Sequence, residues 1–388
     1  MTIIIGGYIG LLPASGLTWD YLQYLLGLKC LGHDVYYVED TGAYPNYQLS
    51  QDPDWSDASD TINYLSEVMT RFGFAEKWAY RNAVDGKCHG ISAENVKKIC
   101  ARADIFINLS AASLPREEYM NIPIKIMVDT DPMFTQVQNW DDKDPDTSYS
   151  NAWDAYCVYD KLASFGENIG NADCKVPALN LNWKATRQPI CINIWANQNI
   201  LPANGTFTTI MNWSTRKPMI FQGEEWGQKN AEFAKIKSLP KSTPDSFFSI
   251  VVSDNSGTFV KGDLEIEGWS IFSPDERIAD LDHYKSFIQT SFGEISIAKQ
   301  TYVKSHCGWF PPRSACYLAS GRPVVLQETG WTKFIPSGDG VISFTESQGA
   351  ADGIRRIQGD PNKHSKAALE IAYEYFSSDT VLRELIDV

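Results

Sequence analysis

One short stretch of the sequence combines basic residues, hydroxyls, glycine and proline in an order that suits anion binding. Residues 304–325 read KSHCGWFPPRSACYLASGRPVV. We expect a glycine turn and then a helix over 312–320, since prolines are tolerated in the first helical turn, where amide hydrogens have no partner. Arg313 and Ser314 would then lie at the positive end of the helix dipole. Such a helix end binds phosphate groups, so the stretch predicts a diphosphate site.

Carboxylates of the first half are candidates for proton transfer. Asp129 and Asp131 form a DxD pair after the apolar run IKIMV, and Asp20 follows the first glycine turn. A DxD pair can hold a metal ion and a sugar diphosphate, because carboxylates supply hard oxygen ligands. The phosphate-type features lie in the second half, so we prefer Asp131 or Asp20 as the base that takes a proton from an acceptor hydroxyl. Each carboxylate is also compatible with a cap or turn role.

The first apolar run ends in a glycine turn, Gly6-Gly7-Tyr8-Ile9-Gly10. The turn lacks the GxGxxG spacing, so it is weak support for a dinucleotide site. Three interpretations stay open. The glycines permit tight packing, or they form a phosphate site, or Gly6, Gly7 and Tyr8 form the wall of an acceptor site.

The sequence predicts no resident metal ion and no bound cofactor. Asp142, Asp144 and Asp146 imitate the start of an EF-hand loop, but Trp153 occupies its twelfth position and the sixth is not glycine. No histidine stands at zinc-ligand spacing from a cysteine. A charged substrate would therefore have to be bound by side chains and helix ends.

Alternating strand and helix patterns must position these residues. A βαβ unit is expected from TIIIGG, LTWDYLQYLLGLKCLG and HDVYYVED, and strands return at 104–110 and 122–129. In the second half we expect strands at 189–195, 218–223, 247–253, 294–299, 323–328 and 340–344, with helices at 226–238, 280–290, 312–320 and 346–358. The pattern predicts an α/β protein of two Rossmann-like doubly wound domains, 1–185 and 186–388, facing across a cleft with C-terminal helices packing across.

Composition bounds the protein's class and partners. The chain has 388 residues, 43% hydrophobic and 21% charged, which is an ordinary globular mixture. Its net charge of -14 and the lack of any Lys/Arg run argue against a nucleic-acid or anionic-lipid partner. The eight cysteines form no CxxC pair, which indicates reduced thiols in a cytoplasmic protein. No apolar run is long enough for a membrane span.

The 304–325 stretch resembles the nucleotide-sugar-binding region of GT-B type glycosyltransferases, which have two Rossmann-like domains. Shared features are the glycine turn, the helix and the closing step ASGRPVV. The opening HCGW also resembles the diphosphate-binding signature of plant-type UDP-sugar glycosyltransferases. The chain departs from these patterns where Phe310 and Pro311 follow the tryptophan in place of Asn and Ser. Cys316 stands where many members have a Glu that binds ribose.

The resemblance implies a set of donor-binding residues. The loop after the 323–328 strand would contact the hydroxyls of the donor sugar, since a carboxylate beside an amide suits such hydrogen bonds. Lys229 would neutralise the leaving diphosphate, although its position also fits a solvated helix lysine. The implied donor-side residues are Lys229, His306, Gly308, Arg313, Ser314, Gln327, Glu328 and Thr329.

These expectations together describe a cytoplasmic, metal-independent glycosyltransferase. It would move a sugar from a nucleotide sugar, its co-substrate, to a small-molecule or glycan acceptor, with domain closure excluding water. Two alternatives stay open. One is a nucleotide-sugar epimerase on the same architecture, and the other is a non-catalytic protein that binds a nucleotide or sugar.

Overall fold

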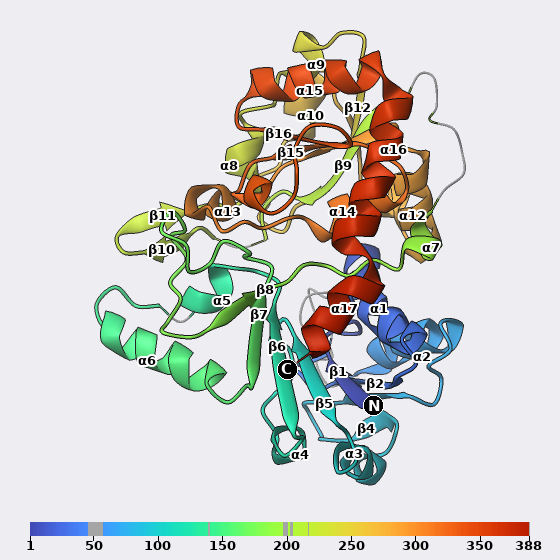
Figure 1. Ribbon diagram of the computed structural model, residues 1–388, viewed down its shortest axis with the longest axis vertical. Helices are drawn as coiled ribbons and strands as arrows, with labels where there is room; N and C mark the ends of the chain where they lie inside the picture. The colour runs from blue at the N-terminus through green and yellow to red at the C-terminus, as the bar shows by residue number, and fades with distance from the viewer. Residues whose placement is uncertain (46–56, 139, 197–200, 202–204, 216, 388) are drawn as a thin grey trace.

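The chain forms two large, mainly parallel β-sheets, one from each half of the sequence (Figure 1). The structure is a computed structural model of residues 1–388, and it describes all of them except 46–56, 139, 197–200, 202–204, 216 and 388. The predicted fold class is confirmed, because both sheets have the parallel strands and flanking helices of a Rossmann-like unit. The predicted boundary at 185/186 stays a prediction, although the first sheet ends at Ala185 and the second begins at Thr206.

The first sheet has eight strands in the order β4-β3-β2-β1-β5-β6-β7-β8. All neighbours pair in parallel except β3 and β4, which are antiparallel. Helices cover both faces of such a sheet, so its strands are rich in buried β-branched residues. Ile3, Ile4 and Ile5 of the first strand are fully buried. The strands are β1 (Thr2–Gly6), β2 (Asp34–Glu39), β3 (Trp78–Arg81), β4 (Cys88–Gly90), β5 (Ile105–Leu109), β6 (Ile124–Asp129), β7 (Lys161–Ser164) and β8 (Trp183–Ala185).

The second sheet has six strands, all paired in parallel, in the order β13-β12-β9-β14-β15-β16. A separate antiparallel hairpin, β10 (Met219–Phe221) and β11 (Glu224–Trp226), lies outside it. The strands of the sheet are β9 (Thr206–Asn212), β12 (Phe247–Ser253), β13 (Ser270–Phe272), β14 (Gly293–Ser296), β15 (Val324–Gln327) and β16 (Val341–Phe344).

Helices connect the strands in both halves. The helices of the first half are α1 (Ser15–Cys30), α2 (Ser59–Arg71), α3 (Ala93–Cys100), α4 (Glu117–Met120), α5 (Phe134–Val137) and α6 (Pro145–Tyr156). Those of the second half are α7 (Ile192–Trp195), α8 (Lys229–Phe233), α9 (Leu239–Ser242), α10 (Lys261–Glu265), α11 (Pro274–Arg277), α12 (Leu281–Thr290), α13 (Gln300–Ser305), α14 (Pro312–Ala319), α15 (Ser347–Gly359), α16 (Pro361–Ile371) and α17 (Ser378–Ile386). Two short helical segments, 331–333 and 372–376, complete the set.

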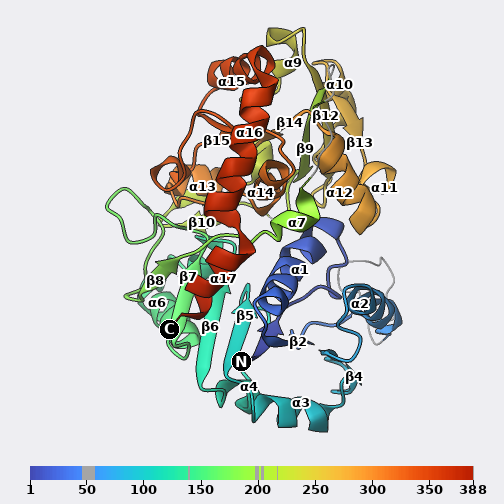
Figure 2. The same ribbon diagram turned by 45° about the vertical axis from the view of Figure 1, so that its right-hand side comes forward.

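The chain crosses between the two halves twice, and the crossings pair with each other. The amide of Ile190 donates to the carbonyl of Phe376 at 2.7 Å, and the amide of Ser378 donates to the carbonyl of Ile190 at 2.9 Å. After the second crossing, α17 lies beside α1 of the first half (Figure 2). Gly27 permits this approach, because an added Cβ would lie 2.9 Å from Ser378 Cβ. The predicted packing of the C-terminal helices across the molecule is therefore confirmed.

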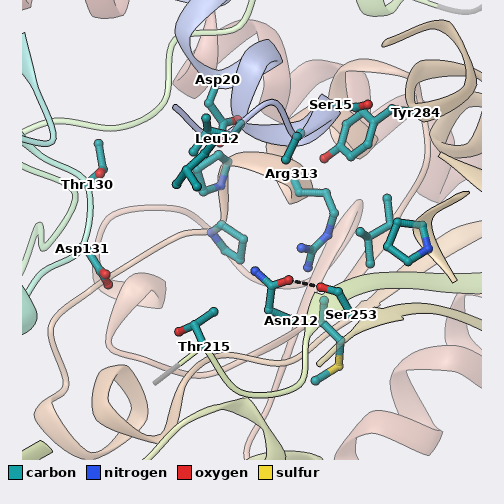
Figure 3. A pocket seen from close by; sticks show the side chains of 18 of the residues that line it. Leu12, Ser15, Asp20, Thr130, Asp131, Asn212, Thr215, Ser253, Tyr284 and Arg313 are labelled. Carbon is teal, nitrogen blue, oxygen red and sulfur yellow. Dashed lines mark hydrogen bonds between the residues drawn. The ribbon is translucent and has the colours of Figure 1, made fainter. Parts of the chain in front are cut away.

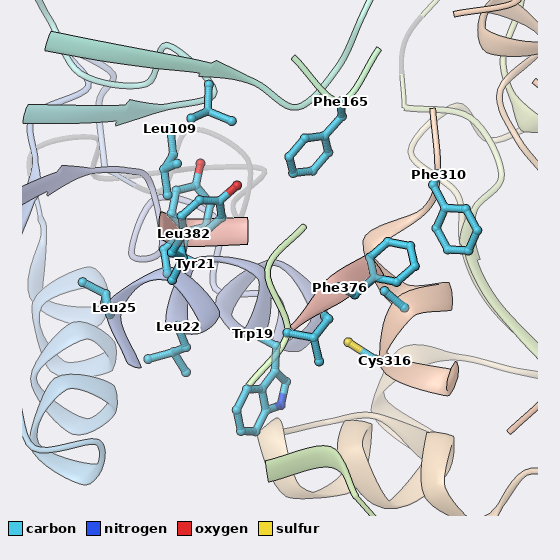
Figure 4. Packing of buried hydrophobic residues seen from close by; sticks show 14 of the residues in the cluster. Trp19, Tyr21, Leu22, Leu25, Leu109, Phe165, Phe310, Cys316, Phe376 and Leu382 are labelled. Carbon is cyan, nitrogen blue, oxygen red and sulfur yellow. The ribbon is translucent and has the colours of Figure 1, made fainter. Parts of the chain in front are cut away.

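One hydrophobic core runs through this junction (Figure 4). Trp19 and Leu22 of α1 belong to the same cluster as Phe376 and Leu382 from the end of the chain. The rings of Trp19 and Trp195 meet edge to face at 5.2 Å. Each buried aromatic side chain removes a large apolar area from water, so this cluster fixes the two halves around the crossings.

Several elements of the second half differ from the sequence prediction. The strand expected at 189–195 is a crossing segment that ends in α7, and the strand expected at 218–223 is β10, one arm of the hairpin. The helix expected over 226–238 is limited to α8. No strand was expected over β9, which lies inside the sheet between β12 and β14. Its polar threonines did not suggest a buried strand in the sequence. β-branched Thr nevertheless suits a strand, and in the structure the Thr208 hydroxyl has buried partners in Ser291 and Tyr317.

Candidate active site

A cavity of about 690 Å³ lies between the two halves (Figure 3). Residues that follow β1, β5 and β6 line it from the first half, and residues that follow β9 and β12 line it from the second. Ligands of parallel α/β sheets bind outside the carboxyl ends of the strands, because loops there are free to vary while the sheet holds them. We call the two sides the first-half wall and the second-half wall.

Basic residues gather on the second-half wall. Arg313, in the first turn of α14, donates from Nε to Glu294 Oε1 at 2.6 Å and from Nη2 to Ser296 Oγ at 3.2 Å. Glu294 is fully buried on β14, so this ion pair fixes the guanidinium against the sheet while Arg313 still lines the cavity. The helix predicted at 312–320 is α14, and its first turn places Arg313 at the cavity.

Lys229 lies on the same wall at the start of α8. Burial lowers the pKa of its ammonium well below the usual value, and the nearby charges of Arg313 and Lys299 lower it further. Within the described residues the ammonium makes no hydrogen bond or ion pair. The charge of Glu294 raises this pKa in part, but Glu294 is paired with Arg313, so a bound anion would further stabilise the protonated form of Lys229.

Asp20, on α1, lines the first-half wall. Burial raises the pKa of this carboxyl to about 8, although the charge of Arg313 lowers it. No hydrogen bond to the carboxylate oxygens occurs in the part of the chain that the structure describes. A free carboxyl that changes its charge near neutral pH is suited to accept a proton from a substrate.

The two aspartates of the DxD pair have different surroundings. Asp129 is fully buried and accepts hydrogen bonds from the Ser164 hydroxyl, the Thr135 hydroxyl and the Gln136 amide. Asp131 lines the cavity, where its oxygens lie 2.9 and 3.1 Å from Lys299 Nζ.

The metal-binding interpretation requires both carboxylates to face one ligand. Asp129 and Asp131 face different partners, so the pair does not meet this requirement. Across the described residues, no group of three or more His, Cys, Asp or Glu side chains is placed to hold a metal ion.

A group of hydroxyls on the first-half wall was missed by the sequence analysis. Ser110 Oγ lies 2.7 Å from Thr130 Oγ1 and accepts a hydrogen bond from the Tyr21 hydroxyl at 3.2 Å. Ser110 has a left-handed backbone, with a φ of 57°, which is uncommon for a residue other than glycine. Tyr8 also lines the cavity and its ring contacts that of Tyr21 at 5.3 Å. Tyr8 was predicted as part of the acceptor loop, but no motif marks Tyr21 or Ser110, because the hydroxyls come from separate segments of the chain.

The glycines of the first turn pack behind the residues of the first-half wall. A Cβ at Gly7 would lie 2.7 Å from Tyr21 Cδ1, so the glycine is needed for packing. Of the predicted acceptor loop, only Tyr8 lines the cavity, whereas Gly6 and Gly7 do not. The next residues of the loop are held by Glu39, whose oxygens accept hydrogen bonds from the amides of Gly10 at 2.8 Å and Leu11 at 2.7 Å.

Six of the predicted donor residues do not line the cavity. Ser314 points away from it, because its hydroxyl donates to the buried Glu294 at 2.5 Å. Gln327 is buried and accepts from the amide of Ala298 at 3.1 Å. Glu328 accepts from the Ser343 hydroxyl at 2.7 Å, and the Thr329 hydroxyl donates to the carbonyl of Trp309 at 2.7 Å. These three residues stabilise the loop after β15, where the sequence resemblance had implied contacts with the sugar.

His306 and Gly308 also lie outside the cavity. His306 is exposed at the left-handed end of α13, and its Nδ1 lies 3.3 Å from Asp173 Oδ2. Gly308 has a φ of 82°, and a Cβ there would lie 2.8 Å from the Asn168 amide nitrogen. The HCGW stretch thus forms a contact between the two halves, and of its residues only Trp309 reaches the cavity.

The structure resembles solved glycosyltransferase structures along its whole length. An alpha-glucosyltransferase in complex with UDP and a 13-mer DNA containing an HMU base has a TM-score of 0.60 at 11% identity, over 100% of this chain and 98% of that one. AviGT4, a glycosyltransferase of avilamycin A biosynthesis, has a TM-score of 0.57 at 11% identity, over 100% and 96%. The chain has the GT-B fold.

A third GT-B structure, sucrose-phosphate synthase from Thermosynechococcus elongatus, has a TM-score of 0.54 at 11% identity and covers 99% of this chain and 97% of that one. No protein-family profile and no curated protein matches the sequence. The resemblance of the 304–325 stretch to GT-B proteins thus predicted the fold correctly from about twenty residues. Of the helices that the structure describes, none has the length and apolarity needed to cross a membrane.

These comparisons overturn the prediction that nucleic acid is excluded as a partner. In several of the similar solved structures an alpha-glucosyltransferase is bound to DNA. The prediction was wrong because a net charge of -14 averages over the whole surface, whereas binding depends on the charges of one face or cleft.

Proposed function

We propose that the protein is a glycosyltransferase that moves a sugar from a nucleoside diphosphate sugar to an acceptor hydroxyl. One observation carries this proposal: the cavity has three basic residues on its second-half wall and a free carboxyl, Asp20, on its first-half wall. The first arrangement suits a leaving diphosphate, and the second suits the proton of an attacking hydroxyl. The GT-B fold supports the same assignment.

The diphosphate of the donor would lie against Lys229 and Arg313. Lys229 has a free ammonium, and Arg313 has guanidinium hydrogens beyond those that its contacts with Glu294 and Ser296 use. UDP is the first nucleotide to test, because it is bound in similar structures.

The reaction would then proceed by direct transfer between the two walls. The anomeric carbon forms a bond to the acceptor oxygen, and its bond to the diphosphate oxygen breaks. The electron pair leaves with the nucleoside diphosphate, whose charge Lys229 and Arg313 stabilise. The hydroxyl proton passes to Asp20. Asp20 is therefore the proposed base, rather than Asp131, which is paired with Lys299.

The basic residues would take the place of a metal ion at the diphosphate. Asp129 and Asp131 are both engaged by protein groups, which supports a reaction that continues in the presence of a chelator. A cytoplasmic location is also part of the proposal, since all eight cysteines are free thiols and disulfides are rare there.

The acceptor would contact the first-half wall, where the hydroxyls of Tyr21, Ser110 and Thr130 meet. Such a wall can hydrogen-bond an uncharged hydroxyl-bearing group. A hydroxymethylated base in DNA is one acceptor to test, because the similar alpha-glucosyltransferase is bound to DNA with an HMU base.

The test is UDP binding and UDP-glucose turnover, both with EDTA present. We expect UDP to bind and UDP-glucose to be consumed, and we expect Lys229→Met to weaken UDP binding about 10-fold, which corresponds to roughly 1.4 kcal/mol. Lys229 is the informative residue because its removal leaves no protein group without a partner. The matched control is Lys285→Met on α12, which does not line the cavity. A strict need for Mg²⁺ or Mn²⁺, or equal UDP affinity of the Lys229 variant, would contradict the proposal.

A further inference from the structure

A cluster of four residues joins the two walls of the cavity. Asp131 and Phe134 come from the first half, and Lys299 and Tyr302 come from the second. The carboxylate of Asp131 binds Lys299 Nζ with both oxygens and accepts a hydrogen bond from the Tyr302 hydroxyl. The ammonium of Lys299 also lies over the rings of Phe134, at 4.6 Å, and Tyr302, at 5.2 Å. Asp131, Lys299 and Tyr302 all line the cavity.

The three basic residues of the cavity differ in the source of their counter-charge. Arg313 is paired with Glu294, which is fully buried on its own wall. Lys229 makes no ion pair among the described residues, and the nearby charge of Glu294 is shared with Arg313. Lys299 is paired with Asp131, which belongs to the opposite wall and whose side chain is 29% exposed. Of the two carboxylates that pair with these basic residues, Asp131 is the more exposed, so its side chain can turn away from its partner more easily than the buried Glu294.

The backbone near Asp131 would stay in place if its side chain moved. The amide of Asp131 donates to Asp129 Oδ1 at 3.0 Å, and Asp129 is fixed by its own buried hydrogen bonds. A rotation of the Asp131 side chain thus breaks the contact with Lys299 and Tyr302 without unfolding the loop after β6.

We propose that Asp131 is a gate for the donor, which neutralises Lys299 in the empty cavity and releases it to the phosphates of the nucleotide. This inference rests on the proposed function, and it adds Lys299 to the groups that bind the diphosphate. A diphosphate carries more charge and more acceptor oxygens than one carboxylate, so it competes effectively for the ammonium. Part of its binding free energy is used to break the contact with Asp131.

The gate makes an unusual prediction, because the loss of a residue in the cavity should strengthen ligand binding. We expect Asp131→Asn to bind UDP about 5-fold more tightly and Lys299→Gln to bind it about 5-fold more weakly, as measured by calorimetry. In the double variant the gain from Asp131→Asn should vanish, since there is no ammonium left to release. The matched control is Asp142→Asn, because Asp142 also joins the two halves, through the amides of Gln222 and Gly223, but does not line the cavity. It should leave UDP affinity unchanged.

Each outcome separates the gate from the proposed function. Tighter UDP binding by the single variant Asp131→Asn, but not by the double variant, supports the gate. Unchanged or weaker UDP binding by Asp131→Asn overturns the gate and leaves the proposed function intact. Absence of UDP binding in the wild type, extended to GDP, dTDP, ADP and pyrophosphate, overturns both. If Asp131→Asn does not fold, Tyr302→Phe removes one hydrogen bond to Asp131 and is expected to strengthen UDP binding by a smaller factor. Unchanged or weaker binding by that variant overturns the gate as well.

Discussion

The two walls of the cavity have opposite chemistry. The second-half wall presents Lys229, Lys299 and Arg313, whereas the described residues of the first-half wall include Asp20 and Asp131 but no lysine or arginine. The first-half wall instead has hydroxyls and aromatic rings. In a two-substrate cavity this separation assigns each wall to one substrate, because an anion binds where the cations are and an uncharged hydroxyl group binds where hydrogen-bonding groups are.

The difference also explains how an acidic protein can bind a diphosphate. With a formal net charge of -14, the chain repels anions from most of its surface. Three basic residues gather in one partly enclosed cavity, and their attraction for a bound diphosphate is stronger there than in water because the surroundings have a lower dielectric constant. The net charge of the whole chain therefore does not predict which substrates the cavity binds.

The largest expected effect comes from the carboxyl of the first-half wall. Asp20→Asn should lower the rate of transfer at least about 100-fold, because an amide cannot accept the proton, while UDP affinity stays within about 2-fold of the wild type. Since burial raises the pKa of Asp20 to about 8, the wild-type rate should rise as the pH rises toward 8, where the base loses its proton. That rise should be absent in Asp20→Asn. The measurement is the transfer rate between pH 6 and 9.

Asp60→Asn serves as the control, because Asp60 is exposed on α2 and does not line the cavity. If Asp20→Asn weakened UDP binding as strongly as Lys229→Met does, the two walls would not have separate roles.

The smallest expected effect concerns Glu39, which holds the loop behind the first-half wall. Glu39→Gln loses one acceptor for the amides of Gly10 and Leu11, so it should raise the acceptor KM about 3-fold and leave UDP affinity unchanged. Burial raises the pKa of Glu39 to about 7, and hydrogen bonds from Gly10, Tyr37 and Leu11 lower it. The wild type should therefore resemble the variant at pH values below about 7, where Glu39 is protonated.

Hydrogen exchange of the 8–12 segment between pH 6 and 8 would measure this loosening. Glu76→Gln, a residue that does not line the cavity, is the control. An equal loss of UDP affinity in Glu39→Gln would show that the loop serves the donor and not the acceptor.

The sequence predicted the fold better than the site. Strands with buried apolar runs, such as β1 and β15, follow from local pattern, and the 304–325 stretch predicted α14 with Arg313 in its first turn. β9 was missed because its threonines look polar in the sequence and become buried only through partners such as Ser291 and Tyr317.

The predicted donor residues that lie outside the cavity have a physical explanation of the same kind. The sequence shows that His306, Gln327 and Thr329 are polar, but their orientation depends on neighbours that are distant in the chain. Gln327 faces Glu232, and Thr329 faces Trp309. Lys299 and Ser110 had no motif, since their place in the cavity comes from the packing of two sheets. Tertiary contacts thus decide which polar side chains reach a substrate.

A crystal structure of the protein with UDP tests the central claim most directly. We expect phosphate oxygens within hydrogen-bonding distance of Lys229 Nζ and the Arg313 guanidinium, with Lys299 turned from Asp131 toward the phosphates. A diphosphate bound on the first-half wall, or held by a metal ion at Asp131, would contradict it.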